Sequence, residues 1–156
     1  MRLYLIQHGE AKPEAEDPER SLTAKGEEEV RRVSAVAKKM DFRASKIYHS
    51  GKRRAQQTAE IMAIALTLPV ESAHGLNPLD DISPWAERIS NETKNLMIVG
   101  HLPFLEKLTS FLLCGDEGAR VVLFRYGAIV CLHRKEDGRW AVHWVLTPEM
   151  ASSDTR

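Results

Sequence analysis

The sequence predicts an α/β fold with three layers, in which helices cover both faces of a mainly parallel sheet with an antiparallel edge strand or hairpin. Short apolar runs alternate with longer amphipathic segments as far as Leu113, an order typical of parallel strands joined by helices. The pattern then changes to apolar runs on either side of Asp137-Gly138, a pair that favours a tight turn between antiparallel strands. We expect one domain over residues 1–150 and a frayed polar tail over residues 151–156.

The expected strands and helices follow from the spacing of the apolar side chains. Residues 2–7 (RLYLIQ) form a short apolar run that ends at His8, which is typical of a buried strand entering a turn. Val30 and Val33 recur at helical spacing behind Thr23, a residue type favoured at helix N-caps. The elements expected in chain order are a strand at 2–7, a helix at 23–40, a strand at 46–49, a helix from 50–51 to 66, an extended stretch at 67–72, a short helix at 85–91, a strand at 95–99, a helix from 103 to about 113, and strands at 121–124, 128–133 and 140–145.

Composition excludes several classes of function. The chain has 22 basic and 22 acidic residues among 156, so its bulk charge does not favour nucleic acid or a membrane surface as a partner. Its two cysteines form no CxxC pair and no carboxylate–histidine cluster is visible, so we expect no metal and no cofactor. The longest apolar-leaning run, residues 61–70, is much shorter than the about 20 residues of a membrane helix, and no signal peptide is visible. We therefore expect a cytoplasmic protein.

Three side chains that can bind an anion follow the ends of predicted strands. His8 follows the first strand, His101 follows the strand at 95–99, and Arg54 begins the helix after the strand at 46–49. Ligands of open α/β sheets bind just beyond the carboxyl ends of the strands. A parallel sheet would therefore bring these three distant residues to one edge. Taken singly, a histidine after a strand is more often part of an ordinary turn, so the joint placement carries the argument.

Two imidazoles and one guanidinium suit phosphoryl transfer. A neutral imidazole nitrogen can attack phosphorus and form a phosphohistidine. A second, protonated imidazole can neutralise charge on the phosphoryl oxygens, and an arginine can bind two of those oxygens with its fork of N–H groups. Helix N-termini add backbone donors at the same place. The predicted site therefore fits a phosphate group without a metal ion.

Four segments of the chain carry these residues and their neighbours. They read LIQHGEA at 5–11, DPERSLTAKG at 17–26, HSGKRRAQQTA at 49–59 and VGHLP at 99–103. In this order and spacing they resemble the motifs of the histidine phosphatase superfamily, with its phosphoglycerate mutase-like fold, and in particular its SixA-like branch of protein phosphohistidine phosphatases. The resemblance covers residues 1 to about 148. It implies that His8 is the nucleophile and phosphate carrier, that Arg54 and His101 hold the phosphoryl group, and that Arg20 lies near the pocket and also binds phosphate.

The chain departs from the family pattern at Gln7, where the first motif of the family has an arginine. Glutamine keeps an N–H donor for phosphate but loses the charge and the fork, which would weaken an enzyme without necessarily abolishing its activity. A general acid is also hard to find. Asp80 and Asp81 lie in the loop where larger family members place an acidic proton donor, and their alternative role is that of solvated loop residues.

The resemblance leads to one leading hypothesis and two alternatives. The leading hypothesis is a phosphatase that removes phosphate from phosphohistidine on a signal-transduction or phosphotransfer protein, such as a phosphocarrier or a histidine phosphotransfer domain, through phospho-His8. The chain leaves little room for an insertion that would cap the pocket, which suits a macromolecular substrate. The first alternative is a module that binds phosphate or phosphohistidine with little or no turnover, because of Gln7. The second is a phosphatase of small molecules.

Overall fold

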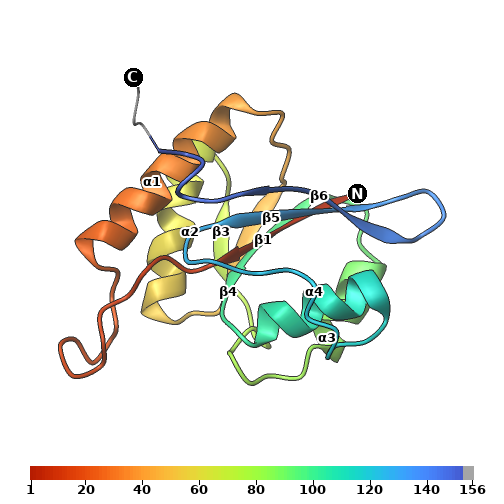
Figure 1. Ribbon diagram of the computed structural model, residues 1–156, viewed down its shortest axis with the longest axis horizontal. Coiled ribbons are helices and arrows are strands. Elements are labelled where there is room, and N and C mark those ends of the chain that lie inside the picture. Colours follow the sequence, from red (N-terminus) through yellow and green to blue (C-terminus); the bar gives the residue numbers. More distant parts are fainter. Residues whose placement is uncertain (153–156) are drawn as a thin grey trace.

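Six strands form one mixed sheet in the computed structural model of the protein, which describes residues 1–152 (Figure 1). The order of strands across the sheet is β3-β2-β4-β1-β5-β6. The strands are β1 (Arg2–Gln7), β2 (Lys46–His49), β3 (Val70–Ser72), β4 (Leu96–Gly100), β5 (Ile129–Arg134) and β6 (Trp140–Leu146), and the helices are α1 (Ala24–Lys39), α2 (Arg53–Leu66), α3 (Ser83–Ser90) and α4 (Phe104–Cys114).

The strand direction reverses between β1 and β5, two strands from one edge of the sheet. Strands β1, β4, β2 and β3 are parallel to one another, whereas β5 pairs antiparallel with both β1 and β6. The carboxyl ends of the four parallel strands and the amino-terminal end of β5 therefore lie at the same edge of the sheet. This topology confirms the predicted mainly parallel sheet with an antiparallel hairpin at one edge.

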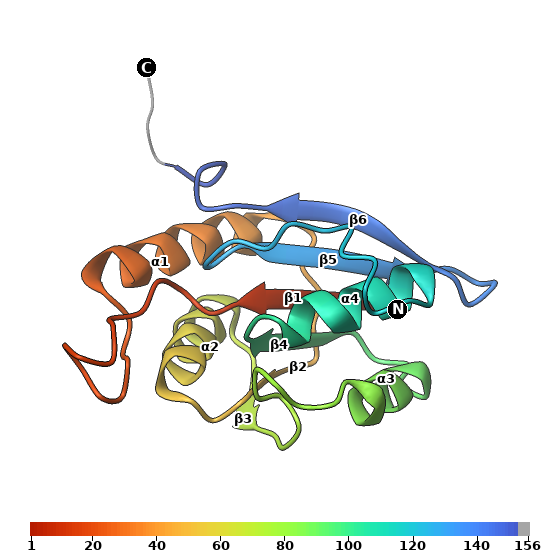
Figure 2. The ribbon, with the colours of Figure 1, turned by 60° about the horizontal axis from the view of Figure 1, so that its bottom comes forward.

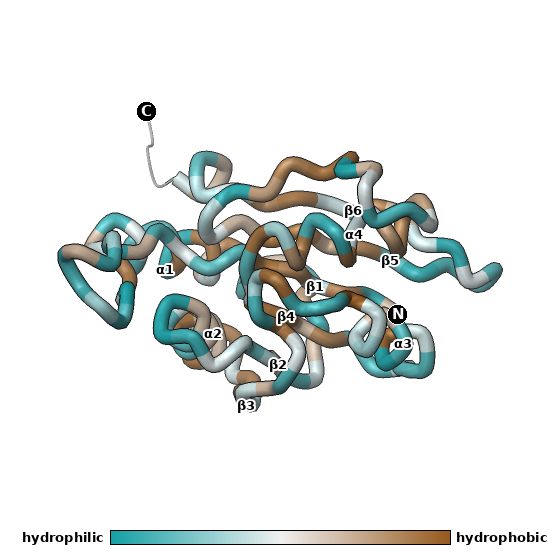
Figure 3. Tube along the Cα trace, turned by 90° about the horizontal axis from the view of Figure 1, so that it is seen from below, coloured by the Kyte–Doolittle hydropathy of each residue, from teal (hydrophilic) through white to brown (hydrophobic). Residues whose placement is uncertain are grey.

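Helices cover both faces of the sheet, as Figure 2 shows, with α1 and α2 on one side and α3 and α4 on the other. Strand β1 contributes to both layers in turn, because successive side chains of a strand point to opposite faces. Leu3 and Leu5 pack in the cluster that includes α3 and α4, and Tyr4 and Ile6 pack in the cluster that includes α1 and α2. Figure 3 shows the resulting hydropathy, with apolar central strands and a hydrophilic turn between β5 and β6.

Helix α1 begins where the sequence predicts. The hydroxyl of Thr23 accepts a hydrogen bond from the N–H of Gly26 at 2.9 Å, which caps the first turn. The N–H of Thr23 donates to the carbonyl of Glu10 at 3.0 Å, so the start of the helix is held against the segment that follows β1. Gly26 is buried at this contact, and the helix thereby fixes the turn that carries His8.

The strand predicted at residues 121–124 is wrong. Strand β5 already pairs with β1 on one side and β6 on the other, so the sheet offers this segment no free position beside β5. Its side chains still follow a strand-like alternation, because Phe124 is buried in the core while Val121 and Leu123 are exposed. The apolar content of the segment therefore reflects partial packing and not membership of the sheet.

The chain remains packed against the core as far as Ala151. Ala151 is buried, and its N–H donates to the carbonyl of Thr147 at 3.1 Å, so the first residue of the predicted tail packs against the core. Residues 153–156 lie outside the described residues. No helix within residues 1–152 is long and apolar enough to cross a membrane.

Replacing Gly26 with alanine is expected to destabilise the protein by about 1–3 kcal/mol, although alanine is the better helix former by about 1 kcal/mol. A Cβ atom at this position would overlap the carbonyl oxygen of Glu10, and backbone atoms cannot move aside as a flexible side chain can. Gly118→Ala is the matched control, since its Cβ would meet only the side chain of Asp116, at 3.3 Å. Chemical denaturation measures both free energies of unfolding, and equal values for the two variants would contradict the prediction.

Candidate active site

The structure brings together the three residues that the sequence places after strand ends. His8 directly follows β1 and His101 directly follows β4, and these two strands are adjacent and parallel. The centroids of the two imidazole rings are 5.1 Å apart. Arg54, the second residue of α2, donates a hydrogen bond from Nε to Nε2 of His8 at 3.3 Å. Both imidazoles and the guanidinium therefore lie within reach of one small anion.

The ring of His8 is held in one orientation. Its Nδ1 lies 2.7 Å from the carbonyl oxygen of Gly9, and because a carbonyl only accepts, Nδ1 carries the proton in the neutral ring. The lone pair is therefore on Nε2, the nitrogen that faces Arg54. Such a nitrogen can act as a nucleophile without first losing a proton.

The backbone beside His8 is fixed by the buried hydroxyl of Thr58. This oxygen accepts a hydrogen bond from the N–H of Gly9 at 2.9 Å and donates to the carbonyl of Arg54 at 2.8 Å. One side chain thus ties the turn after β1 to the start of α2. The approach needs glycine at position 9, because a Cβ atom there would come within 2.9 Å of Cγ2 of Val30.

His101 is almost completely buried and has an unusual set of partners. Its Nε2 lies 2.6 Å from the hydroxyl of Ser50, which follows β2. Its Nδ1 is buried without a hydrogen-bond partner among the described residues. Unpartnered polar atoms are uncommon in protein interiors, and catalytic sites are one place where they occur.

Burial and nearby cations favour neutral imidazoles in the free protein. Burial lowers the pKa of His8 from 6.5 to about 4. The hydrogen bond to the Gly9 carbonyl opposes this effect, and the charges of Arg54 and Arg20 each lower the pKa by a smaller amount. Burial also lowers the pKa of His101 to about 3, and the charges of His8, Arg54, Lys52 and Arg20 act in the same direction. Around neutral pH both rings are therefore uncharged until an anion binds.

A cationic hollow of about 540 Å³ lies on the Arg54 side of His8. Its lining contains four cations, Arg20, Lys52, Arg53 and Arg54, against two carboxylates of the loop before α1. Arg20 is positioned by a hydrogen bond from its Nε to the carbonyl of Lys12 at 3.1 Å. Burial lowers the pKa of Arg54, and the nearby charge of Arg20 lowers it further. Arg20 therefore lies within electrostatic range of the three central residues, as expected for a residue near the pocket.

Gln7, the residue before His8, lies outside the cationic hollow. It is buried and lines a second hollow of about 490 Å³ together with Tyr126, whose ring centroid is 5.5 Å from that of His8. The backbone carbonyl of Gln7 accepts from the N–H of Gly127 at 2.9 Å. The side-chain amide makes no hydrogen bond within residues 1–152. Its N–H groups are therefore free of partners in this part of the protein.

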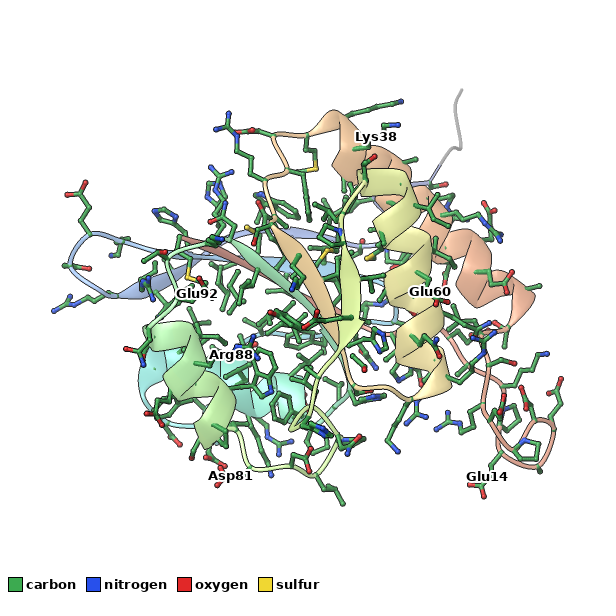
Figure 4. All side chains as sticks on the ribbon, turned by 180° about the vertical axis from the view of Figure 1, so that it is seen from behind. Glu14, Lys38, Glu60, Asp81, Arg88 and Glu92 are labelled. Atoms are coloured by element: carbon green, nitrogen blue, oxygen red, sulfur yellow. The ribbon has the colours of Figure 1, made fainter. Side chains whose placement is uncertain are left out.

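Asp80 and Asp81 make local hydrogen bonds in the loop between β3 and α3. Asp80 accepts from the N–H of Asn77 at 2.8 Å, and Asp81 accepts from the N–H and hydroxyl of Ser83, each at 2.9 Å. Figure 4 shows Asp81 at the start of α3, well apart from Glu14, which lines the cationic hollow. Neither aspartate is among the contacts of His8 or the residues that line the two hollows in the described part of the chain.

Sequence reasoning missed three residues of the site: Ser50, Thr58 and Tyr126. Tyr126 was not foreseen because it precedes an antiparallel strand, so its position at the same edge depends on the pairing of β5 with β1. Thr58 lies one helical turn after Arg54, a spacing that allows its hydroxyl to bond the arginine carbonyl. Ser50 follows β2 as His8 follows β1, and this parallel placement was the available signal.

No group of three or more His, Cys, Asp or Glu side chains is placed to hold a metal ion within residues 1–152. The candidate site instead combines two imidazoles, several cations and the N-terminus of α2. This arrangement suits an oxyanion with several negative charges, such as a phosphoryl group.

Comparisons with known proteins agree with this geometry. Residues 3–81 match the histidine phosphatase superfamily (branch 1). The phosphohistidine phosphatase SixA of Escherichia coli (strain K12) is 27% identical over 155 residues, which covers 95% of this chain and 94% of that protein. An uncharacterised protein of Picosynechococcus sp. is 33% identical over 137 residues, 83% of each chain. A solved structure of the protein histidine phosphatase SixA complexed with tungstate superposes with a TM-score of 0.83 at 25% identity, covering 95% of this chain and 97% of that one.

The two buried histidines are expected to make the protein less stable in acid. In the unfolded chain both rings titrate near the ordinary value of 6.5, whereas in the folded protein their pKa values are about 4 and about 3. Between these values the unfolded state binds more protons, so stability is complete above about pH 6.5 and is lost as the pH falls toward 4. We expect the free energy of unfolding to drop by more than about 2 kcal/mol from pH 7 to pH 4.5.

The control is the double variant His8→Gln/His101→Gln, measured by chemical denaturation at the same two pH values. The variant keeps every carboxylate, so the difference in lost stability between variant and wild type measures the contribution of the two imidazoles. The variant is expected to lose clearly less stability than the wild type. An equal loss in both proteins would show that other groups cause the acid sensitivity.

Proposed function

The chain belongs to branch 1 of the histidine phosphatase superfamily, and on this premise we propose that it removes phosphate from phosphohistidine on a protein, through a phosphorylated His8. The observation that carries the proposal is the arrangement around Nε2 of His8. This nitrogen carries the lone pair of the neutral ring, accepts a hydrogen bond from Nε of Arg54 at 3.3 Å and lies beside the ring of His101. A nucleophile and two groups that stabilise phosphoryl charge thus share one site.

In the first step, Nε2 of His8 attacks phosphorus and forms a new P–N bond. The bond between phosphorus and the substrate imidazole breaks, and its electron pair stays with the substrate nitrogen, which takes up a proton from solvent. Arg54 binds the phosphoryl oxygens, whose charge also favours a proton on His101, against the effect of burial. Arg20 and Gln7 act as further phosphate ligands in this proposal.

In the second step, water attacks phosphorus of phospho-His8. The P–N bond breaks, its electron pair returns to Nε2, and the phosphoryl group leaves as inorganic phosphate that carries the oxygen and protons of the water. The net reaction is hydrolysis of phosphohistidine to histidine and phosphate. The hydrogen bond from Nδ1 of His8 to the Gly9 carbonyl keeps the ring oriented through both steps.

The lack of an aspartate contact to His8 within the described residues supports a phosphoramidate substrate. Asp80 and Asp81 are engaged in their own loop, so their assignment as proton donors has no support from the contacts of His8. An imidazole leaves readily once it is protonated, and its cleavage needs a strong acid less than cleavage of a phosphate ester does. A site with strong phosphate ligands and, within residues 1–152, no carboxylate among the contacts of His8 therefore suits phosphohistidine better than phosphoserine.

The segment between α2 and β4 lines neither of the two hollows, which supports a protein substrate. Between α2 and β4 the chain forms only β3, a loop and the short α3, whose Trp85 and Ile89 pack into the core beside the sheet. This segment therefore adds no helical cap over the two hollows. The similarity to SixA over 95% of the chain supports the same substrate class.

Gln7 supports one alternative, a module that binds phosphohistidine with little or no turnover. A hydrogen bond to a charged group contributes about 1.5–3 kcal/mol, so loss of the family arginine corresponds to a rate reduction of roughly tenfold to a few hundredfold. Binding depends less on this contact, because the cationic hollow and Arg54 are intact. Turnover by the wild type separates the two functions.

Replacing His8 with alanine is expected to abolish hydrolysis. The substrate is a histidine phosphotransfer domain labelled with ³²P on its histidine, and the measurement is the release of inorganic phosphate. His143→Ala, which changes an exposed histidine of β6, is the control and should behave as the wild type. Wild-type release no faster than that of His8→Ala would contradict the proposal, and retention of label together with tight vanadate binding would favour the binding module.

Replacing Gln7 with arginine is expected to raise kcat/KM by about tenfold or more, since it restores a charged fork beside the phosphoryl group. The hollow that Gln7 lines has room for the longer side chain. Gln7→Lys is the matched control, because it restores the charge without the fork and should give a smaller gain. Unchanged or lower kcat/KM in both variants would show that glutamine is not the weak point of the site.

A further inference from the structure

An apolar segment without a sheet partner runs past the candidate site. Val121 and Leu123 expose 59% and 83% of their surface, and Tyr126 exposes 45%. Phe124 anchors the segment in the core, so the exposed side chains are held in place from below. Exposed apolar side chains are ordinary when they are scattered, but a row of them beside a pocket is typical of a binding surface.

The backbone of this segment is also available. Within the described residues, no N–H group from Val121 to Tyr126 donates a hydrogen bond. Val121, Leu123 and Tyr126 are exposed, so water can reach the backbone of this segment. A partner that approaches the segment with its own carbonyl groups can replace that water, as in other cases where an extended segment binds a polypeptide.

The segment leads directly to His8. Leu123, Phe124 and Tyr126 line the 490 Å³ hollow together with Gln7 and Leu102. Tyr126 contacts the ring of His8, and Gly127 is hydrogen-bonded to Gln7. A molecule with its phosphoryl group over Nε2 of His8 and its remainder in this hollow would thus contact the apolar segment.

Charge distinguishes the two hollows, one of which adjoins His8 at Arg54 and the other at Tyr126. The hollow lined by Arg20 and Arg54 has four cations against two carboxylates, which suits the phosphoryl group. The hollow lined by Leu123 and Tyr126 has two cations and two carboxylates around an apolar wall. A substrate whose charge is concentrated on its phosphoryl group would therefore place its less charged part against the apolar wall.

We propose that residues 121–126 and the adjoining hollow receive the surface of the protein that carries the phosphohistidine, with Leu123 and Tyr126 as its main apolar contacts. The inference rests on the proposed function and adds the surface that selects the substrate. The end of the hollow beside Gln7 and Tyr126 takes the leaving imidazole, whereas Leu123 and the exposed segment beyond it take the polypeptide next to that histidine. An imidazole alone would not reach the outer part of the segment, where Val121 lies exposed.

The test compares Leu123→Ser with Ile64→Ser. Both side chains expose 83% of their surface, so neither substitution removes core packing, and Ile64 lies in the C-terminal half of α2 away from both hollows. The substrates are a histidine phosphotransfer domain phosphorylated on histidine and free N-phosphohistidine. Leu123→Ser is expected to lower kcat/KM for the phosphorylated domain by about tenfold, mainly through KM. Its kcat/KM for free phosphohistidine and both values for Ile64→Ser should stay within about twofold of the wild type.

The outcomes separate this inference from the proposed function. A wild type that does not hydrolyse the phosphorylated domain overturns both. If the wild type and Leu123→Ser hydrolyse the phosphorylated domain equally well, only the docking surface is overturned. If Leu123→Ser lowers kcat/KM equally for both substrates, the hollow binds the leaving imidazole alone. If the wild type is a dimer and Leu123→Ser dissociates it without changing either kcat/KM, the segment serves self-association. Either result also overturns the inference.

Discussion

The parallel pairing of β1 with β4 sets Gln7 opposite Gly100, and the next hydrogen bond along the pair runs from the N–H of His8 to the carbonyl of Gly100 at 3.1 Å. This register decides where both strands end, and therefore places the two imidazoles beside one another. Strand β2 pairs with β4 in the same direction and delivers Ser50 to the ring of His101. A shift of one residue in either pair would turn His8 or His101 to the opposite face of the sheet.

Helices α1 and α2 hold the residues at this edge of the sheet in position. Thr58 ties the turn at Gly9 to the first residues of α2, which holds Arg54 beside His8. Gly26 lets α1 approach the backbone of Glu10. The local rigidity has an electrostatic consequence, since burial keeps the imidazoles neutral while the cations stay charged. The free site is thus positively charged and carries an available lone pair, a combination that favours a phosphoryl group over a cation or a neutral ligand.

The two hollows beside His8 differ, and in the proposed function this difference would connect the chemistry with the choice of substrate. The side of Arg54 is rich in cations, and the side of Gln7 is bounded by an apolar wall. With arginine at position 7, both sides would be charged. Glutamine reduces the charge there while leaving polar N–H groups. In the proposed function, the residue that slows turnover would therefore also leave a neutral surface for the rest of the substrate, and catalytic strength and substrate preference would depend on the same position.

Local patterns in the sequence were enough to predict the α/β class, the order of elements through α4 and the residues that follow the parallel strands, because apolar periodicity and strand–helix alternation are local properties. Residue spacing therefore sufficed to predict that His8, Arg54 and His101 share one edge. The contacts of Tyr126 and Ser50 with these rings, and the reason why residues 121–124 are not a strand, are visible only in the folded protein. Those features depend on which strand occupies the place beside β5 and on hydrogen bonds between segments far apart in the chain, which no local pattern of side chains encodes.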